Sequence, residues 1–283
     1  MAEASAPASS ANLGPGFDVL ALAVGLRCRV VAEPAAAWAI DHGDGQRPDA
    51  DSDDAVLAGA QAAVGADNPM ALKVDNEIPI GRGLGSSAAA LAAGAAAALA
   101  AHTGRADSDR VFELTARIEG HPDNAAAAVY GGLILISAEG RPWRLPIHPG
   151  IRPVVAVPGD VFLTADARQA VPETVSRSTA MRTATRLASL VAGFLTADAQ
   201  FFAAAHGDEI HEAPRSRLRP QTAELVVRAC DAGALHAAWS GSGPSVVALV
   251  DPSTERKVVE ALRLPGVQVL SLQVATDGLE VSA

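Results

Sequence analysis

The chain has 283 residues, of which 49% are hydrophobic and 19% are charged. This composition is typical of a folded globular protein with a substantial core, and it excludes an intrinsically disordered chain. The formal net charge of -10 argues against binding to nucleic acid or to an anionic membrane, because both attract proteins through positive charge. An anionic ligand would therefore depend on local backbone amides, a metal ion or a few well-placed arginines.

Other features of the sequence indicate a cytoplasmic protein. The first residues lack the basic start and apolar run of a secretory signal peptide. The longest apolar stretch, residues 88–101, is too short and too rich in alanine to span a bilayer comfortably. The two cysteines, Cys28 and Cys230, provide neither a disulfide framework nor a metal site, so we expect reduced and buried thiols.

The first half of the chain alternates between strand and helix patterns. After a polar N-terminal segment, residues 20–31 have the β-branched, apolar texture of a strand, and an acidic run at 41–54 is typical of an exposed loop. Serine at the start of a helix is the expected N-cap chemistry. The further elements expected here are a helix at 55–64, a strand at 71–74, a long alanine-rich helix opening at Ser86 and Ser87, a helix at 108–119, a turn at 121–124 and a buried strand at 131–137.

Three prolines between residues 142 and 150 interrupt this pattern, and we expect a domain boundary there, with domains at 1–145 and 146–283. Two adjacent strands in the second half are expected to form a hairpin through Gly241-Ser242-Gly243-Pro244. This order of elements predicts an α+β fold. The elements expected in the second half are strand 153–157, helices 176–195 and 222–232, strands 234–239 and 245–250, helix 254–262 and strand 267–274.

The strongest chemical signal is the run Gly81-Arg82-Gly83-Leu84-Gly85-Ser86-Ser87-Ala88. Its three glycines allow positive φ angles and a close approach of the backbone to a ligand. The helix that follows begins with amides that have no internal acceptor, and these amides attract phosphate together with the helix dipole. The run lacks the lysine of a Walker A loop. An ordinary turn would account for the glycines alone, whereas the paired serines and the long helix favour phosphate binding.

A second polar motif lies near the N-terminus, where Asn12 and Asp18 flank the turn Gly14-Pro15-Gly16. Both side chains could point into a cleft and bind the amine or hydroxyl of a polar substrate. Asn and Asp beside glycine are also common in solvated Asx turns. On chemistry alone, both interpretations stay open.

A phosphate loop without lysine needs Mg²⁺ to bridge the phosphates, and Mg²⁺ takes oxygen ligands from one or two side chains. Glu113 and a hydroxyl of the paired serines would supply them. Glu119 is the competitor, which we expect on the exposed face or in helix-end interactions. Taken singly, His121 is typical of a capping or packing residue and Asp123 of a turn carboxylate.

Two arginines, Arg168 and Arg215, each lie beside an expected turn or helix start. Arginine binds carboxylates through paired donors, so two arginines that converge on one α-carboxylate would define an amino-acid substrate. Each of them alone is typical of a surface residue. The Gly/Ser turn at 240–245 is typical either of a hairpin or of a wall packed against the phosphate loop.

These motifs together resemble those of the GHMP kinase superfamily over essentially the whole chain. Ser9 stands where threonine is commoner in that family, and Asp54 stands where its members usually carry an asparagine, ahead of the helix that borders the adenine pocket. Three segments resemble the superfamily motifs in the expected order: SSANLGPGFD (9–18) resembles the first motif, GLGSSAA (83–89) the nucleotide loop, and SGSGPS (240–245) the third motif. The features that resemble homoserine kinases in particular are the first motif, EGHPDN (119–124) leading into Gly131 and Gly132, Thr164 with Arg168, and Arg215.

The resemblance implies an N-terminal domain of ribosomal-protein-S5 type that binds ATP, a ferredoxin-like C-terminal domain, and an active site between them. The residues implied to hold L-homoserine are Asn12, Asp18, His121, Asn124, Arg168 and Arg215, the two arginines at its carboxylate. Those implied around the phosphates of ATP are Arg82, Gly83, Leu84, Gly85, Ser86, Ser87 and Ala88, with Ser87 and Glu113 at Mg²⁺. The implied catalytic set is Asn12, Asp18, Asn124, Thr164 and Arg168, with Thr164 near the transferred phosphoryl group.

The implied activity is transfer of the γ-phosphate of ATP to the side-chain hydroxyl of homoserine, a step of threonine biosynthesis. Phosphoryl transfer depends mainly on positioning and charge neutralisation, so a strong base is not obligatory and we expect Asp123 to be structural first. Two alternatives stay open. One is a GHMP kinase for another small carboxylated alcohol, such as shikimate, a mevalonate-like acid or pantoate; the other is a non-catalytic relative that binds ATP or an amino acid. A homodimer also stays open.

Overall fold

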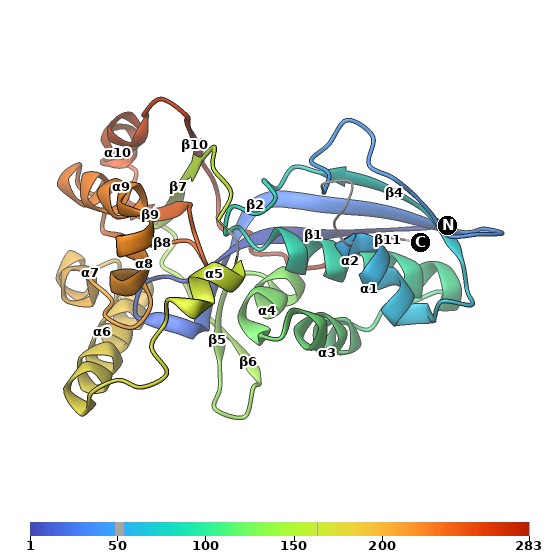
Figure 1. Ribbon diagram of the computed structural model, residues 1–283, viewed down its shortest axis with the longest axis horizontal. Coiled ribbons are helices and arrows are strands. Elements are labelled where there is room, and N and C mark those ends of the chain that lie inside the picture. Colours follow the sequence, from blue (N-terminus) through green and yellow to red (C-terminus); the bar gives the residue numbers. More distant parts are fainter. Residues whose placement is uncertain (49–53, 163, 283) are drawn as a thin grey trace.

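The computed structural model describes residues 1–48, 54–162 and 164–282. Of Thr164 it describes the backbone alone. Within these ranges the chain folds around two sheets, with the first and second halves of the sequence at opposite ends of the molecule (Figure 1). The first sheet has seven strands, and all of its pairings are antiparallel except that of β3 with β4. The second sheet has four antiparallel strands in the order β10-β7-β9-β8.

The first sheet is built around one long hairpin, β1 and β2, whose apolar residues face a layer of helices. Its strands are β1 (Ala2–Asn12), β2 (Gly16–Pro34), β3 (Ala39–Asp41), β4 (Met70–Asn76), β5 (Leu133–Ile136), β6 (Pro142–Leu145) and β11 (Glu280–Ser282). Its helices are α1 (Ala55–Val64), α2 (Ser86–Thr103), α3 (Ser108–Glu119) and α4 (Pro122–Tyr130).

Helices α1 and α2 cross very closely because small residues meet at the crossing. A Cβ added to Gly59 would overlap the backbone of Leu91, and one added to Gly94 would overlap the backbone of Val56. Alanine elsewhere along α2 lets neighbouring backbones pack against it from every side, so the helix is buried over most of its length. This packing fixes the N-terminus of α2, which is where the glycine-rich loop ends.

The second sheet carries α9 and α10 packed against it through a small apolar cluster that includes Leu225 and Val258. Its strands are β7 (Arg152–Pro158), β8 (His236–Trp239), β9 (Val246–Val250) and β10 (Val267–Ser271). The helices of this half are α5 (Thr164–Gln169), α6 (Arg177–Thr196), α7 (Ala199–Ala205), α8 (Glu212–Leu218), α9 (Pro220–Asp231) and α10 (Glu255–Leu262).

The chain passes between the two sheets more than once. It leaves the first sheet after β6, close to the boundary expected at residue 145, and returns at its C-terminal end, where β11 pairs with β1. Figure 1 shows the two termini side by side. The turn between β1 and β2 also reaches the second half, where Asn12 forms an antiparallel β-bridge with Ser240. The two-domain division at residue 145 therefore stays a prediction, and the last residues lie on the first sheet.

Local sequence signals predict most of the observed elements. Helices 55–64 and 108–119 begin and end where expected, because Asp54 and Asp107 cap their N-termini and glycines follow their C-termini. The hairpin of β8 and β9 is confirmed, and so is the α+β fold. Both cysteines are free thiols. None of the described helices is long and apolar enough to cross a membrane.

The segment before Asn12 is a buried strand, β1, which the sequence pattern did not predict. Two local predictions are wrong. Gly85, not a serine, is the N-cap of α2, and the two serines are the first residues of the helix itself. A helix, α4, begins at Pro122 where only a turn was expected, because proline is well suited to a first helical position. Of the acidic loop predicted at 41–54, residues 49–53 lie outside the described residues.

Candidate active site

A cavity of about 480 Å³ lies between the two halves of the molecule, which is a size suited to small ligands. Each half contributes part of its wall. The contributions from the first half include Asn12, Phe17, Asp18, residues 80–87 except Arg82 and Leu84, Ile118, Glu119, His121, Asp123 and Asn124. Those from the second half are Arg168, Arg215, Gly241 and Ser242.

The glycine-rich loop forms one end of the cavity with a conformation that only glycine adopts easily. Gly83 and Gly85 have φ angles of 76° and 62°, and a Cβ on Gly83 would overlap the carbonyl oxygen of Ser240. The first amide of α2 to bond within the helix region is that of Ala89, which donates to Gly85 O. The amides that precede it at the helix N-terminus provide the anion-binding geometry expected from the sequence.

The members of the predicted nucleotide loop differ in how they take part. Gly83, Gly85, Ser86 and Ser87 line the cavity, and Ser87 is exposed. Leu84 and Ala88 are buried, so they can offer only backbone atoms. The side chain of Arg82 is outside the cavity and donates to Gly159 O at 2.6 Å. The Arg82 guanidinium ties the loop to the end of β7, and the place of Arg82 among the nucleotide-binding residues stays a prediction.

The N-terminal turn places Asn12 and Asp18 at the cavity in a strained conformation. Asn12, Leu13 and Asp18 all have positive φ angles, and only one other non-glycine residue among those described does. Asn12 Nδ2 donates to Gly241 O at 2.8 Å, while its Oδ1 accepts from the Asp18 amide at 3.1 Å. These hydrogen bonds hold the turn against the second half of the molecule at the cavity wall. The sequence alone had not distinguished such an arrangement from a solvated loop.

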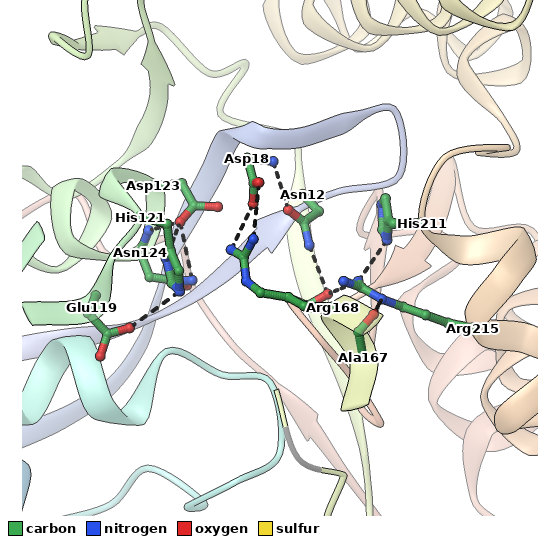
Figure 2. Close-up of polar contacts among 11 residues, drawn as sticks. Asn12, Asp18, Glu119, His121, Asp123, Asn124, Ala167, Arg168, His211 and Arg215 are labelled. Atoms are coloured by element: carbon green, nitrogen blue, oxygen red, sulfur yellow. Dashed lines mark hydrogen bonds and ion pairs between the residues drawn. The ribbon is translucent and has the colours of Figure 1, made fainter. Parts of the chain in front are cut away.

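Arg168 and Arg215 reach the cavity from α5 and α8 and lie near one another (Figure 2). Arg168 donates to both oxygens of Asp18, at 3.1 and 3.4 Å, and its side chain is about half exposed. Arg215 is only 1% exposed; its Nη1 donates to Gly241 O at 3.2 Å and its Nε to Ala167 O at 3.0 Å. Burial lowers the pKa of Arg215 to about 10, so it is a cation at neutral pH.

Behind Arg215 lies His211, a residue that sequence reasoning did not select. Its Nδ1 accepts from Arg215 Nη1 at 2.9 Å, and its Nε2 lies 2.8 Å from Gly14 O. Arginine only donates and a carbonyl only accepts, so His211 is neutral with its proton on Nε2. Burial lowers the pKa of His211 to about 4, in agreement with this state. Phe17 stacks on both His211 and the Arg215 guanidinium.

A second polar group lies across the cavity, where α3 ends and α4 begins (Figure 2). Asp123 is buried, and its Oδ1 accepts from the Asn124 amide at 2.7 Å and contacts His121 Nδ1 at 3.1 Å. The hydrogen bond to Asp123 raises the pKa of His121. Glu119 lies on the other side of this imidazole, with Oε2 3.8 Å from Nε2.

The structure places Glu119, and not the expected Mg²⁺ ligand Glu113, at the cavity wall. Glu113 is exposed on α3 and is not among the residues that line the cavity, whereas Glu119 is. Glu119 is six positions after Glu113, which places the two side chains about 120° apart around the helix axis. Of the other expected site residues, Thr164 begins α5, and its side chain lies outside what the structure describes.

The architecture and the site match those of one class of proteins. A family model for the N-terminal domain of GHMP kinases matches residues 54–132, and one for the C-terminal domain matches residues 195–268. The crystal structure of homoserine kinase from Cytophaga hutchinsonii superposes with a TM-score of 0.85 at 27% identity, covering 99% of this chain and 96% of that one. The fold and the cavity between its halves thus define a GHMP kinase.

Sequence relatives narrow the class further. The homoserine kinase of Clavibacter michiganensis subsp. michiganensis is 38% identical over 256 residues, which is 86% of this chain and 80% of the relative. The homoserine kinase of Rhodococcus erythropolis is 37% identical over an alignment of 310 residues that covers 99% of this chain and 95% of the relative. The chain belongs to the homoserine kinase family of GHMP kinases.

Proposed function

We propose that this protein transfers the γ-phosphate of ATP to the side-chain hydroxyl of L-homoserine and forms O-phospho-L-homoserine. One observation carries the proposal: a single cavity joins the N-terminus of α2, which suits phosphate, to two guanidinium groups, which suit a carboxylate. The likeness to homoserine kinases over most of the chain supports the same activity. Use of ATP in turn supports the cytoplasmic location expected from the sequence.

The charged groups of the substrate have partners of opposite charge at the end of the cavity away from the glycine-rich loop. Arg168 and Arg215 would bind the α-carboxylate, and Arg168 can do so while it keeps a donor on Asp18, because a guanidinium carries five N–H groups. The carboxylate of Asp18 and the remaining lone pair of Asn12 Oδ1 would bind the ammonium. Asp18 already faces Arg168. The carboxylate of an amino acid would therefore lie beside the Arg168 cation, and its ammonium beside the Asp18 anion.

We also propose that Ser87 and Glu119 hold Mg²⁺. Mg²⁺ bound to a nucleotide takes one or two oxygen ligands from protein side chains, such as a hydroxyl and a carboxylate. Phosphates and water fill its other positions. The Glu119 carboxylate is largely buried at the cavity wall and lies too far from His121 for a short hydrogen bond, so its oxygens retain acceptor capacity. Bound Mg²⁺ would neutralise charge on the β- and γ-phosphates.

The described residues support attack of the hydroxyl without a dedicated base. Asp123 is the nearest candidate, but its Oδ1 already accepts from the Asn124 amide and contacts His121, and its carboxylate lies in the first turn of α4, where negative charge is stabilised. Transfer would then depend on alignment of the hydroxyl with the γ-phosphate by the two halves of the cavity. Asp123→Asn tests this assignment: we expect a near-normal kcat, and loss of turnover in a folded variant would make Asp123 the base.

The direct test of the activity is ADP release with homoserine, shikimate, mevalonate and pantoate as acceptors. We expect turnover with homoserine far above that with the other three. Turnover with another acceptor only would assign a different GHMP kinase activity. Stabilisation by ATP or homoserine in a melting experiment, without ADP release from any acceptor, would instead identify a non-catalytic relative.

The metal assignment makes a separate prediction about two glutamates of α3. Glu119→Gln should raise the Mg²⁺ concentration needed for half-maximal activity by about tenfold or more, because a carboxylate ligand becomes a neutral amide. Glu113→Gln is the matched control and should leave the Mg²⁺ dependence unchanged, since Glu113 is exposed outside the cavity. A titration of activity with Mg²⁺ measures both, and the reverse result would restore Glu113 as the ligand.

A further inference from the structure

The hydroxyl of Ser9 lies where three parts of the site meet. Ser9 is near the end of β1 and is fully buried. Its backbone amide donates to Leu84 O of the glycine-rich loop at 3.0 Å, and its Oγ donates to Asn124 Oδ1 at the start of α4 at 2.7 Å. A Cβ on Gly85 would overlap this hydroxyl, so the loop, the serine and the asparagine are in close contact.

These contacts determine which way the Asn124 amide faces. The Nδ2 of Asn124 lies 3.5 Å from Asp123 Oδ1, a carboxylate oxygen that can only accept. Rotation of the amide by 180° would bring its oxygen against that carboxylate and remove the acceptor of the Ser9 hydroxyl. The Asp123 carboxylate therefore favours the orientation with Oδ1 on Ser9, and in that orientation the Ser9 hydroxyl donates to Oδ1 and leaves Nδ2 free to donate further.

We propose that Ser9 is a positioning residue that holds the Asn124 amide so that Asn124 acts toward the ligand as a hydrogen-bond donor. Asn124 lines the cavity, and Nδ2 has a second N–H beyond the one directed at Asp123. The ligand atom it contacts is then an oxygen with a lone pair, either the reacting hydroxyl or a phosphoryl oxygen. Asn124 neither binds the substrate ammonium nor accepts the hydroxyl proton. This inference rests on the kinase activity proposed above.

The neighbouring residue provides a matched control. Ser10 is also fully buried, and its Oγ has no hydrogen-bond partner among the described residues. Ser9→Ala and Ser10→Ala thus remove the same atom from adjacent positions of one strand. We expect Ser9→Ala to lower kcat/KM by about tenfold, the effect of one lost hydrogen bond in the transition state, and Ser10→Ala to change it by less than about twofold. Ser9→Thr, which keeps the hydroxyl, should retain most of the activity.

A double-mutant cycle with Asn124→Ala separates positioning from a merely structural role. If Ser9 acts through the amide, Ser9→Ala should change kcat/KM by less than about twofold when Asn124 is already alanine. Melting temperatures of all variants identify those that fail to fold. Equal effects of Ser9→Ala and Ser10→Ala, or a full effect of Ser9→Ala in the Asn124→Ala background, would overturn the proposal. The cycle uses whichever acceptor the ADP-release panel identifies, so failure of homoserine as the acceptor is seen separately in the wild type.

Discussion

At Arg215, a cation is buried at the wall of the cavity and held by a carbonyl on each side and by a neutral histidine. Such a geometry needs a planar group with several donors, which lysine does not provide. Arg215→Lys should therefore raise KM for the carboxylated substrate by about tenfold or more, with a smaller change in KM for ATP. Arg217→Lys, on the exposed face of the same helix, is the control. Steady-state kinetics with each substrate varied would contradict the assignment if both variants behaved alike.

A second residue-scale prediction concerns Glu212, which is buried next to this site. Its Oε1 accepts from the Trp239 amide at 2.7 Å, and burial raises its pKa from 4.5 to about 8. Between these values the folded protein keeps a proton that the unfolded chain has lost, so the free energy of unfolding falls as the pH rises from 4.5 to 8. Above pH 8 the buried charge lowers stability throughout.

Glu212→Gln keeps the acceptor for the Trp239 amide and removes the titration. As the pH rises from 5 to 8, we expect the free energy of unfolding of the wild type to fall by at least about 1 kcal/mol more than that of this variant. Urea unfolding at both pH values measures the difference. Glu224→Gln is the control, since Glu224 forms an exposed ion pair on α9. A parallel pH dependence of wild type and Glu212→Gln would show that Glu212 is ionised in the folded protein.

At the scale of elements, helix α2 begins and ends at a glycine with a left-handed conformation, Gly85 and Gly104. Alanine at either position brings a similar backbone strain. At Gly85 the added Cβ would also overlap the Ser9 hydroxyl and lie 3.0 Å from Asn124 Oδ1, whereas at Gly104 it meets nothing within 4 Å.

Alanine at these two positions should therefore affect function differently. Gly104→Ala should lower the melting temperature and leave the KM for ATP unchanged. Gly85→Ala should lower the melting temperature as well and in addition raise the KM for ATP by about tenfold or more, because the loop has to move away from the helix N-terminus. Thermal melting and ATP titrations measure both effects. An unchanged KM in Gly85→Ala would argue against phosphate binding by this loop.

At the scale of the whole molecule, the C-terminal residues join the two halves. Val274 forms a bridge with Val24, and Gly132 donates to Ala275 O. Further along, the Arg27 guanidinium donates to Gly278 O at 2.7 Å, and Gly278 packs against the backbone of Val129. The first half is therefore incomplete without residues that follow the second sheet in sequence.

Removal of residues 277–283 tests this dependence. Because it deletes β11 and the Arg27 acceptors Asp277 O and Gly278 O, we expect the melting temperature to fall by several degrees, about 2–4 °C for each kcal/mol lost in a chain of this size. The loss should also appear as faster hydrogen exchange in β1, the partner of β11. An unchanged melting temperature would mean that the first sheet is stable without its last strand.

The sequence alone determined the elements whose signals are local. Capping aspartates, terminal glycines and apolar periodicity act within a few residues, so α1 and α3 begin and end where the pattern predicts. The glycine-serine loop likewise indicated phosphate binding, because its glycines, its serines and the helix start lie within a short stretch of chain. The first motif pointed to a kinase only through its resemblance to GHMP kinases.

Only the tertiary structure decided which side chains meet. Ser9 and Asn124 are 115 residues apart, and Asp18 and Arg168 are 150 apart; no local signal fixes such a contact. The packing of α3 places Glu119, and not Glu113, at the cavity wall. The packing of the two halves also turns the Arg82 side chain away from the cavity and places His211 behind Arg215. Helix periodicity specifies that a face is polar, whereas packing of the two halves specifies what it faces.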